Sequence, residues 1–484
     1  MNDLVYQTAS QLAEAIRTHQ VSATEVVDAF LSRIEAYNPQ LNAVVTRNDE
    51  AARRRAREAD EALAQGELWG PLHGVPLTVK DSFETAGLRT TSSYKPLADH
   101  VPQRDATVVA RLRAAGAIVL GKTNLPQLAG DNQSHSPLFG PANNPWDLAR
   151  TPGGSSGGEA AALAAGLSPL GLGSDIAGSI RIPAHFCGLF GLKPTDHRVP
   201  NTGHIPPLPG SVGSVRHMPV NGPLARSVDD LRLCLSIIAG PDGQDTGVPP
   251  MPLADVPPRP LSELRFAWSD DFGGIPVSAD THAALAGLAA KLTAAGCHIE
   301  RANPPDFDFQ AAMRTYAELY GTMIYATMPP AMRLFMSLMG PIIYRDSFFR
   351  VASRRARARA VDYFQTLTRR DQLQHALESF LAGYDAWLCP VASVPAFAHR
   401  RPDRLDLPLE VDGRLVPGVE AALAHTLVFN LTGHPVVVVP LAQSAKGLPI
   451  GLQVVGRLWG EMPLLNVAQA LTEITGPFRR PPGY

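Results

Sequence analysis

The chain has 484 residues, 45% of them hydrophobic and 18% charged, a composition typical of a globular protein and not of a disordered one. The formal net charge is −2, so no overall field favours binding to nucleic acid or to an anionic membrane. The four cysteines are scattered without a C-x-x-C pair, which argues against a disulfide framework or a zinc site. We therefore expect reduced thiols and a cytoplasmic location. No His, Asp or Glu cluster has the spacing of metal ligands, so we expect no metal and no other cofactor.

The N-terminal part of the chain is predicted to be mostly helical. Residues 1–20 lack a basic stretch followed by an apolar core and indicate a helix rather than a signal peptide. Apolar residues then recur at helical spacing through 8–65, for example Val26 and Phe30. No run of 18 uninterrupted apolar residues occurs, so no stable membrane span is expected.

Short apolar runs then alternate with helical patterns. Turn residues open the segment 74–83, which becomes a β-rich run ending at Lys80. The segment 105–124 predicts a helix that stops at Gly116 and then a buried strand over 117–120. Such alternation of helix and strand predicts an α/β fold.

The same alternation continues along the chain. A glycine–serine loop at 151–158 precedes a strongly helix-forming run that stops at Gly166, and 167–179 is expected to be a strand that enters a loop. Residues 260–345 are less regular, which suggests an insertion on the core. Further buried strands are expected at 433–441 and 449–456.

Two short motifs match known patterns but lack the context that these patterns need. "GAIVLGKT" (116–123) fits the P-loop pattern, yet its four central residues suit a strand better than a phosphate-binding loop, and Pro126 discourages an immediate helix. "GGSSG" (153–157) fits the nucleophile elbow of α/β hydrolases, yet no strand precedes Ser155. We therefore expect neither nucleotide binding nor an elbow.

Three residues remain as candidates for catalysis: Lys80 in "LTVKDSF", Ser155 in "TPGGSSGG" and Ser179 in "SDIAGSIR". A serine hydroxyl is a weak nucleophile unless a base lies within hydrogen-bond reach. Lysine becomes such a base when burial lowers its pKa from about 10.4, whereas arginine stays protonated. The chain has only six lysines against 37 arginines, and Lys80 follows the apolar Leu77 and Val79. We therefore expect Lys80 to act as the base.

Taken together, these segments resemble the amidase signature family of hydrolases. "GVPLTVKD", "TPGGSSGGEAAALAAG" and "GSDIAGSIRIPAHFCGLFGLKPT" match in order and spacing over roughly residues 70 to 225, with weaker similarity as far as "GLQVVGR". The resemblance implies an α/β/α sandwich around a large twisted mixed β-sheet and hydrolysis of C–N amide bonds. It also implies one domain over 1–484, with 70–225 as the catalytic core and about 245–370 as a more variable region able to form the substrate pocket.

The resemblance assigns a role to each residue of the motif. Ser179 matches the nucleophile that is acylated, Ser155 matches a bridging serine preceded by a cis peptide bond, and Lys80 matches the general base. Ser179 would then give its proton to Ser155, which passes it to Lys80. The oxyanion hole is matched by the backbone amides of Ile176, Ala177, Gly178 and Ser179.

The residues that support this loop follow from the same resemblance. Asp175 and Arg181 are expected to pair and to brace the loop, and Ser156 is a further supporting residue. Position 177 holds Ala where many relatives have Gly. Because a methyl group restricts positive φ, the loop must accept an ordinary backbone angle at Ala177.

Substrate choice is expected to depend on two segments. Residues 125–146 contain "SPLFG", which is similar to fatty acid amide hydrolases and general bacterial amidases. The A subunits of tRNA-dependent amidotransferases usually have an acidic residue where Gln127 stands. The stretch 313–339 holds six methionines and forms either core, a mobile pocket wall or a membrane-seated cap. The candidate pocket residues are Gln127, Leu128, Met323, Met328 and Phe335.

Other conspicuous residues receive structural interpretations. Lys193 is expected in a turn before a proline, His185 as a half-buried histidine with satisfied hydrogen bonds, and Cys187 as a small core residue. The eight arginines of 345–370 predict a solvated helix face, with a contact between subunits or an acidic-substrate site as alternatives.

The sequence therefore predicts a serine hydrolase that cleaves small apolar or aryl amides through an acyl-enzyme on Ser179. The alternatives are a carbamate (urethane) or ester hydrolase with the same triad, and an amidotransferase A-type subunit that needs a partner protein. The expected partner is a small-molecule amide and not nucleic acid. Relatives in the family are often dimers, so a homodimer is a candidate state.

Overall fold

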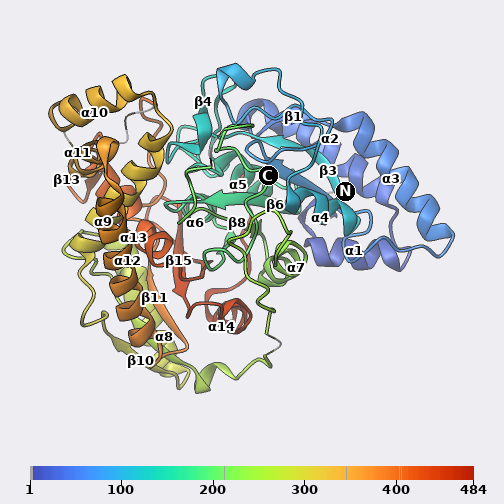
Figure 1. Cartoon of the computed structure of the whole chain (residues 1–484). Helices are drawn as coiled ribbons and strands as arrows, with labels where there is room; N and C mark the ends of the chain where they lie inside the picture. The colour runs from blue at the N-terminus through green and yellow to red at the C-terminus, as the bar shows by residue number, and fades with distance from the viewer. Residues whose placement is uncertain (1–3, 212, 255, 345, 403, 405) are drawn as a thin grey trace.

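A large mixed sheet runs through the whole molecule in the computed structural model, which describes residues 4–211, 213–254, 256–344, 346–402, 404 and 406–484 (Figure 1). Its eleven described strands lie in the spatial order β1 (Val44–Arg47), β3 (Ile118–Thr123), β2 (Pro76–Lys80), β6 (Leu170–Asp175), β8 (Val220–Ala225), β7 (Phe190–Lys193), β14 (Val436–Gln443), β15 (Pro449–Val455), β11 (Ala386–Pro390), β9 (Arg265–Trp268) and β10 (His298–Arg301). Two small hairpin sheets lie beside it: β4 (His135–Ser136) with β5 (Gly140–Pro141), and β12 (Leu409–Val411) with β13 (Arg414–Val416).

The α-helices of the described chain are α1 (Ala9–Arg17), α2 (Ala23–Leu41), α3 (Asp49–Ala64), α4 (Thr107–Ala114), α5 (Gly157–Ala164), α6 (Arg181–Cys187), α7 (Val228–Ile238), α8 (Ala279–Ala294), α9 (Phe309–Ala326), α10 (Pro330–Ile343), α11 (Ser347–Arg354), α12 (Ala360–Leu381), α13 (Gly418–Thr432) and α14 (Glu461–Thr475). Short 3₁₀ turns occur at Leu4–Tyr6, Lys95–Leu97, Gln127–Ala129, Leu261–Glu263 and Arg355–Arg357.

Two groups of helices cover the central strands. α5 packs with α2 and α6, whereas α7 packs with α4 and α14. Both β2 and β6 are buried at every position, so side chains on both of their faces are covered. β2 runs parallel to β3 and to β6, while β8, β7, β14 and β15 follow in antiparallel pairs. The predicted α/β/α sandwich around a mixed sheet is confirmed.

The ends of the first helices are set by local interactions of the residues at those positions. Thr8 and Ser22 each form a capping box, which satisfies free backbone amides at the starts of α1 and α2. Gly116 ends α4 with a φ of +96°, and a side chain there would collide with the backbone of His73. β3 follows immediately, so the residues of the P-loop-like motif form a strand. Lys122 on this strand is buried and donates hydrogen bonds to Thr85 and Thr90.

The segment 8–65 is mostly helical as predicted, with β1 between α2 and α3 pairing antiparallel with β3. One prediction about regular structure was wrong. The region 260–345 is largely regular, and its strands β9 and β10 extend the main sheet beyond β11 instead of forming an insertion on it. Each of these three strands has four residues, and β10 is largely exposed, so alternation of apolar and polar residues is too short to reveal them.

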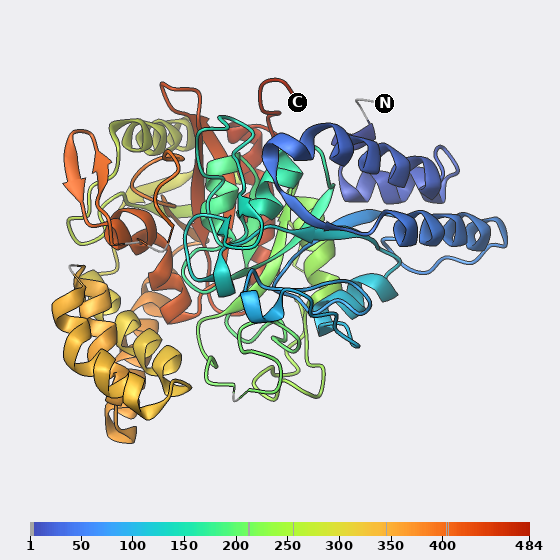
Figure 2. The same cartoon turned by 90° about the horizontal axis from the view of Figure 1, so that it is seen from above.

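The helices α9–α12 gather at one end of the molecule, opposite α1–α3 (Figures 1 and 2). α10 is unusually apolar on its outer surface, with Leu338 61% and Ile342 74% exposed. Within the described part of the chain, no helix has both the length and the apolar character needed to cross a membrane.

Candidate active site

Lys80 ends strand β2 in the interior of the protein. Its Nζ lies 2.7 Å from Ser155 Oγ and 2.9 Å from Ser174 Oγ, with the Ser174 carbonyl oxygen at 3.4 Å. Burial removes the ammonium from water and lowers the pKa of Lys80 to about 7, against the opposing effect of the carboxylates of Asp175 and Glu159. A large fraction of Lys80 is therefore a neutral amine near neutral pH, able to accept a proton from a serine hydroxyl.

Ser155 lies in a tightly held loop before α5. The Gly154–Ser155 peptide bond is cis. Ser134 Oγ donates hydrogen bonds to the carbonyl oxygens of Gly153 at 3.0 Å and Ser155 at 3.3 Å, and accepts one from the amide of Gly157 at 2.9 Å. Ser134 thus fixes the backbone on both sides of the cis bond, a function that no motif in the sequence indicates.

Ser179 lies in the loop between β6 and α6, next to the Ser155 loop. The amide of Ser156 donates to the carbonyl oxygen of Ser179 at 3.2 Å, and Ser156 Oγ donates to the carbonyl oxygen of Ser174 at 3.3 Å. Among the described residues, no hydrogen bond joins the hydroxyls of Ser155 and Ser179. The structure therefore brings Lys80, Ser155 and Ser179 into one site, with the contact between Lys80 and Ser155 already formed.

Asp175 organises the loop that carries Ser179. Its carboxylate accepts hydrogen bonds from the amides of Gly178 at 2.7 Å and Ile180 at 3.1 Å, and pairs with the fully buried Arg181 at 3.0 Å. Burial raises the pKa of this carboxyl, but Arg181 and Asn430 outweigh burial and hold the pKa well below its usual range. The carboxylate is therefore ionised at working pH and can brace the loop as the sequence predicts.

The carbonyl groups of this loop are fixed from two distant helices. Tyr316 of α9 donates its hydroxyl to the Ile176 carbonyl oxygen at 2.8 Å, and Thr426 of α13 donates to the Ala177 carbonyl oxygen at 2.6 Å. Because the carbonyl and the next amide of a peptide unit point in opposite directions, Tyr316 also sets the direction of the Ala177 amide.

Of the four amides predicted to form the oxyanion hole, one already has a hydrogen-bond partner. The amide of Gly178 is already bound to Asp175, whereas the amides of Ile176, Ala177 and Ser179 make no hydrogen bond within the described part of the chain. Gly178 takes the positive φ of +121°, and Ala177 does not need one. The alanine at position 177 is thus compatible with the loop.

A cavity of about 530 Å³ opens onto Ser179. Most of its wall is apolar or aromatic, and its lining residues include one charged side chain, that of Asp131. The wall is formed by Ala129, Gly130, Asp131, Asn132, Gly154, Ile176, Ala177, Ser179, Tyr316, Tyr320, Phe348, Phe349, Val419, Leu423 and Leu427.

The walls of this cavity differ from the predicted ones. Gln127 and Leu128 precede the lining segment 129–132 without lining the cavity themselves. Met323 is buried in the core, and Phe335 is 50% exposed on α10. Met328 lines a neighbouring apolar cavity of about 960 Å³, which shares Tyr320 and Phe349 with the first one. The Met-rich stretch is thus divided among core, a second cavity and surface.

His185, Cys187 and Lys193, which were given structural interpretations, are all buried. His185 is fully rather than half buried, accepts a hydrogen bond from the Gly451 amide at Nδ1, and has Nε2 3.2 Å from the Val394 carbonyl oxygen. Cys187 lies in the core as predicted. Lys193 ends strand β7 instead of lying in a turn, and burial lowers its pKa to about 7.

The arginines after α10 have two kinds of environment. Arg350, Arg354 and Arg357 are exposed, as the solvated face predicts, whereas Arg345 lies outside the described residues. Arg355 and Arg369, in contrast, both form ion pairs with the buried Glu318 of α9 and join the surrounding helices.

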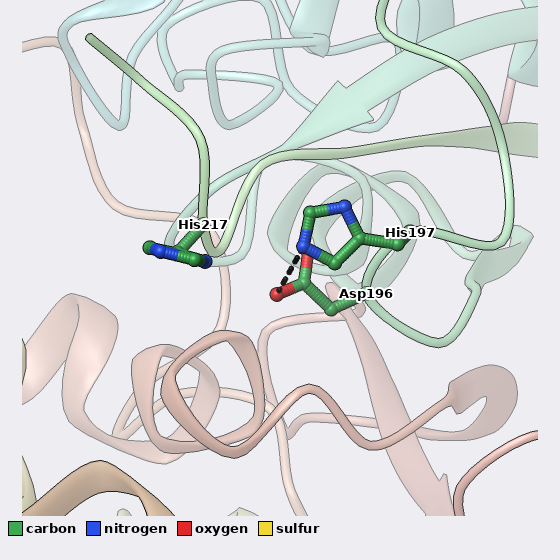
Figure 3. Close-up of side chains that lie close together, drawn as sticks. All are labelled: Asp196, His197 and His217. Carbon is green, nitrogen blue, oxygen red and sulfur yellow. Dashed lines mark ion pairs between the residues drawn. The ribbon is translucent and has the colours of Figure 1, made fainter. Parts of the chain in front are cut away.

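Figure 3 shows a group whose sequence spacing gave no sign of metal binding: Asp196, His197 and His217. Their potential ligand atoms lie within 4.8 Å of one another, and His197 Nε2 lies 3.7 Å from Asp196 Oδ2. The same carboxylate oxygen accepts a hydrogen bond from Arg370 at 2.7 Å, and His217 Nε2 lies 2.9 Å from the Tyr363 hydroxyl. The Asp196 carboxylate is therefore already paired with a cation, that of Arg370.

The chain also matches a known family over most of its length. The Amidase family model covers residues 25–465 of the chain. The chain belongs to the amidase family. It is an amide-cleaving enzyme with the amidase signature, and its fold agrees with solved structures of this family.

The amidases to which the chain is similar differ in function. The A subunit of the glutamyl-tRNA(Gln) amidotransferase of Moorella thermoacetica is 33% identical over 99% of both chains. An acylamidase of Rhodococcus erythropolis is 31% identical over 94% of this chain and 92% of its own. The structure of a 6-aminohexanoate cyclic dimer hydrolase complexed with substrate matches with a TM-score of 0.82 and 29% identity over 99% of each chain. The family is thus clear, while the substrate requires separate argument.

Tyr316→Phe tests the support of the amide loop in this amidase. Loss of the hydrogen bond to the Ile176 carbonyl oxygen is expected to lower kcat about fivefold, the equivalent of about 1 kcal/mol. Steady-state kinetics should show little change in KM, because the phenyl ring remains in the cavity wall. Tyr320→Phe is the matched control, since Tyr320 lines the same cavity from α9 without bonding to the loop. Equal kcat values for both variants would contradict this role.

Proposed function

We propose that the chain hydrolyses small apolar or aryl amides through an acyl-enzyme on Ser179. Ser155 carries the proton of Ser179 Oγ to neutral Lys80 as Ser179 attacks the amide carbonyl carbon. The proton then returns through Ser155 to the leaving amine, the C–N bond breaks, and water attacks the resulting ester by the same route. The contact of 2.7 Å between the buried Lys80 Nζ and Ser155 Oγ carries this proposal.

The tetrahedral intermediate needs donors for its developing negative charge. The amides of Ile176, Ala177 and Ser179 are the candidates, because the Gly178 amide is held by Asp175. Each donor that faces the oxyanion contributes roughly 3 kcal/mol to transition-state stabilisation. The buried pair of Asp175 and Arg181 keeps the loop in place without itself contacting the substrate.

The proposed substrate class rests on the composition of the cavity. Aromatic rings of α9 and α11 and aliphatic side chains of α13 surround the space beside Ser179. Such a wall favours an apolar or aryl acyl group, because its transfer from water is favourable at about 25 cal/mol per Å² buried. Free glutamine carries both an ammonium and a carboxylate group. Binding in this cavity would remove both groups from water, and Asp131 is the one charged side chain in the cavity wall that could compensate.

Phe348→Ala tests the acyl site. Phe348 is buried in the cavity wall and its ring lies 5.9 Å from that of Tyr316 and 5.7 Å from that of Tyr320. Removal of the ring is expected to lower kcat/KM about tenfold for aryl and hexanoyl anilides and much less for acetanilide, since about 1.4 kcal/mol of apolar contact is lost. Phe364→Ala, at a 63% exposed position of α12, serves as control. A uniform loss over all acyl lengths would speak against an acyl site here.

The decisive experiment compares matched aryl amide, ester and carbamate substrates and free glutamine. The purified chain is used alone, as wild type and as Ser179→Ala and Lys80→Ala. Turnover of amides that both substitutions abolish supports the proposal. Preferential turnover of carbamates or esters would favour the alternative in which the same triad acts on those bonds.

A second candidate function is that of an amidotransferase A-type subunit. The similarity to the Moorella protein over nearly the whole of both chains supports it. This candidate predicts release of ammonia from glutamine and dependence on a partner protein. Turnover of apolar amides by the chain alone, without release of ammonia from glutamine, would decide against it.

A further inference from the structure

A second buried acidic group lies next to Lys80 and has no part in the mechanism proposed above. Glu159, in the first turn of α5, is fully buried. Its Oε2 accepts a hydrogen bond from Thr123 Oγ1 at 2.7 Å, and its Oε1 accepts a short one from Thr78 Oγ1. Gly171 on β6 leaves room for the carboxylate, since a side chain there would collide with it. One carboxylate therefore contacts three neighbouring strands of the sheet.

The register of these strands places Glu159 on the side of the sheet from which Lys80 extends. In the pairing of β2 with β3, Lys80 is opposite Thr123, and in the pairing of β2 with β6, Thr78 is opposite Gly171. Thr78 and Lys80 are two residues apart on one strand, so their side chains leave the same face. Glu159 thus holds β2 and β3 together at the place where Lys80 turns toward Ser155.

Glu159 and Lys80 also act on each other through their charges. Burial raises the pKa of Glu159 to about 7, while the two threonine hydroxyls, Lys80 and Lys122 oppose this rise. In turn, the Glu159 carboxylate raises the pKa of Lys80 and so offsets part of the effect of burial, which lowers it. Lys122 alternates with Thr123 on β3 and therefore points to the opposite face of the sheet.

The other charged groups around this centre have partners of their own. Asp175 faces Lys80 but is paired with Arg181. Arg33 and Arg226 donate to carbonyl oxygens at the far end of α5, those of Ala165 and Leu163. His204 is neutral at working pH, because burial and then Lys80 lower its pKa to about 4. Two buried carboxylates near Lys80, Glu159 and Asp81, have no arginine ion pair among the described residues. Asp81 accepts a hydrogen bond from Thr91 Oγ1, and of the two Glu159 is the one whose charge raises the pKa of Lys80.

We propose that Glu159 is a positioning residue of the catalytic centre, which fixes strands β2 and β3 at Lys80 and places its carboxyl group on the face of the sheet from which Lys80 extends. The inference rests on the proposed role of Lys80 as the base. A buried carboxylate that served only to join α5 to the sheet would not influence the pH dependence of turnover.

Glu159→Gln tests this role, because the amide keeps the shape of the side chain and removes its charge. Glu159 is about half ionised near pH 7, so removal of its remaining negative charge lets Lys80 lose its proton more readily, and the acid limb of kcat/KM against pH should move to lower pH. The plateau at high pH should fall, since a weaker base accepts a proton less effectively in the transition state. An acid limb at the wild-type pH would overturn the inference.

Two further variants separate charge from packing. Glu159→Asp keeps the charge, so its acid limb should stay closer to that of the wild type than the limb of Glu159→Gln. Asp230→Asn is the matched control for loss of a buried carboxylate, since Asp230 on α7 binds the amides of Ala9 and Ser10 far along the chain. Its acid limb should not move.

Two measurements keep the outcome clear. Thermal unfolding identifies a variant that has lost its fold, and if Glu159→Gln has lost it, Thr123→Val replaces it. Loss of the Thr123 hydroxyl favours the protonated form of the Glu159 carboxyl, so the acid limb should move in the same direction by a smaller amount. An unmoved limb would again contradict the inference.

Lys80→Ala is measured in parallel. Full activity of Lys80→Ala would refute the proposed function, whereas its loss together with an unmoved limb in Glu159→Gln refutes this inference alone.

Discussion

Ser179→Ala is expected to lower kcat for amide substrates by about a million-fold, to the level left by substrate binding and the oxyanion amides. Without Oγ no ester to the acyl group can form. The backbone amides and the cavity wall remain, so the affinity for a substrate-like ligand should change little. Steady-state kinetics measures the loss of kcat. Mass spectrometry of the intact chain after reaction with a slowly hydrolysed aryl ester shows whether the acyl group is attached to it.

Ser156→Ala is the matched control for this experiment. Ser156 lies in the neighbouring loop and its Oγ donates to the carbonyl oxygen of Ser174. Loss of that hydrogen bond should lower the free energy of unfolding by about 1 kcal/mol. The acyl group should still appear on the Ser156→Ala chain. An acylated Ser179→Ala chain would place the nucleophile elsewhere and contradict the mechanism.

The residues that the structure brings together at the site were predictable because they lie in local motifs. Lys80, Ser155 and Ser179 each stand in a short segment with a distinctive order of small and charged residues. The residues that hold them do not. Tyr316 and Thr426 reach the loop of Ser179 from helices more than a hundred residues away, and neither has a local pattern that indicates this contact.

The walls of the cavity could not be predicted for a related reason. Phe348 and Leu427 have the same apolar character as core residues, and only the packing of α9, α11 and α13 shows that they face Ser179. Methionines looked more adaptable, so the prediction favoured them. The structure instead places aromatic rings beside Ser179 and Met328 in the neighbouring cavity.

The fold shows the same division between local and long-range information. Strands in the middle of the sheet were predicted, such as β14, which begins with a run of four valines after turn residues. β9 and β10 have four residues each and become strands through long-range pairing, β9 with β11 and β10 with β9. Their position at the edge of the sheet leaves one of them exposed, so the sequence carries little of the apolar signal that marks a strand.

The pH dependence of turnover provides the second large expected effect. The pKa of Lys80 is about 7, so the amine form that accepts the proton predominates above that pH. We therefore expect kcat/KM to be half-maximal near pH 7, to fall tenfold for each pH unit below it, and to be level above it. Lys80→Ala should lower kcat/KM by about 10²–10⁴ and remove this limb. Lys80→Arg should not restore activity, because a guanidinium stays protonated.

The same shift predicts the sign of an effect on stability. Between pH 7 and 10.5 the unfolded chain binds a proton at Lys80 that the folded chain does not, so the contribution of Lys80 to the free energy of unfolding rises with pH in this window. Lys80→Met should remove this rise, which urea unfolding at several pH values would measure. A pH profile of kcat/KM that is flat from pH 5 to 9 in the wild type would contradict a titrating Lys80. An unfolding free energy with the same pH dependence in wild type and Lys80→Met would contradict the buried amine.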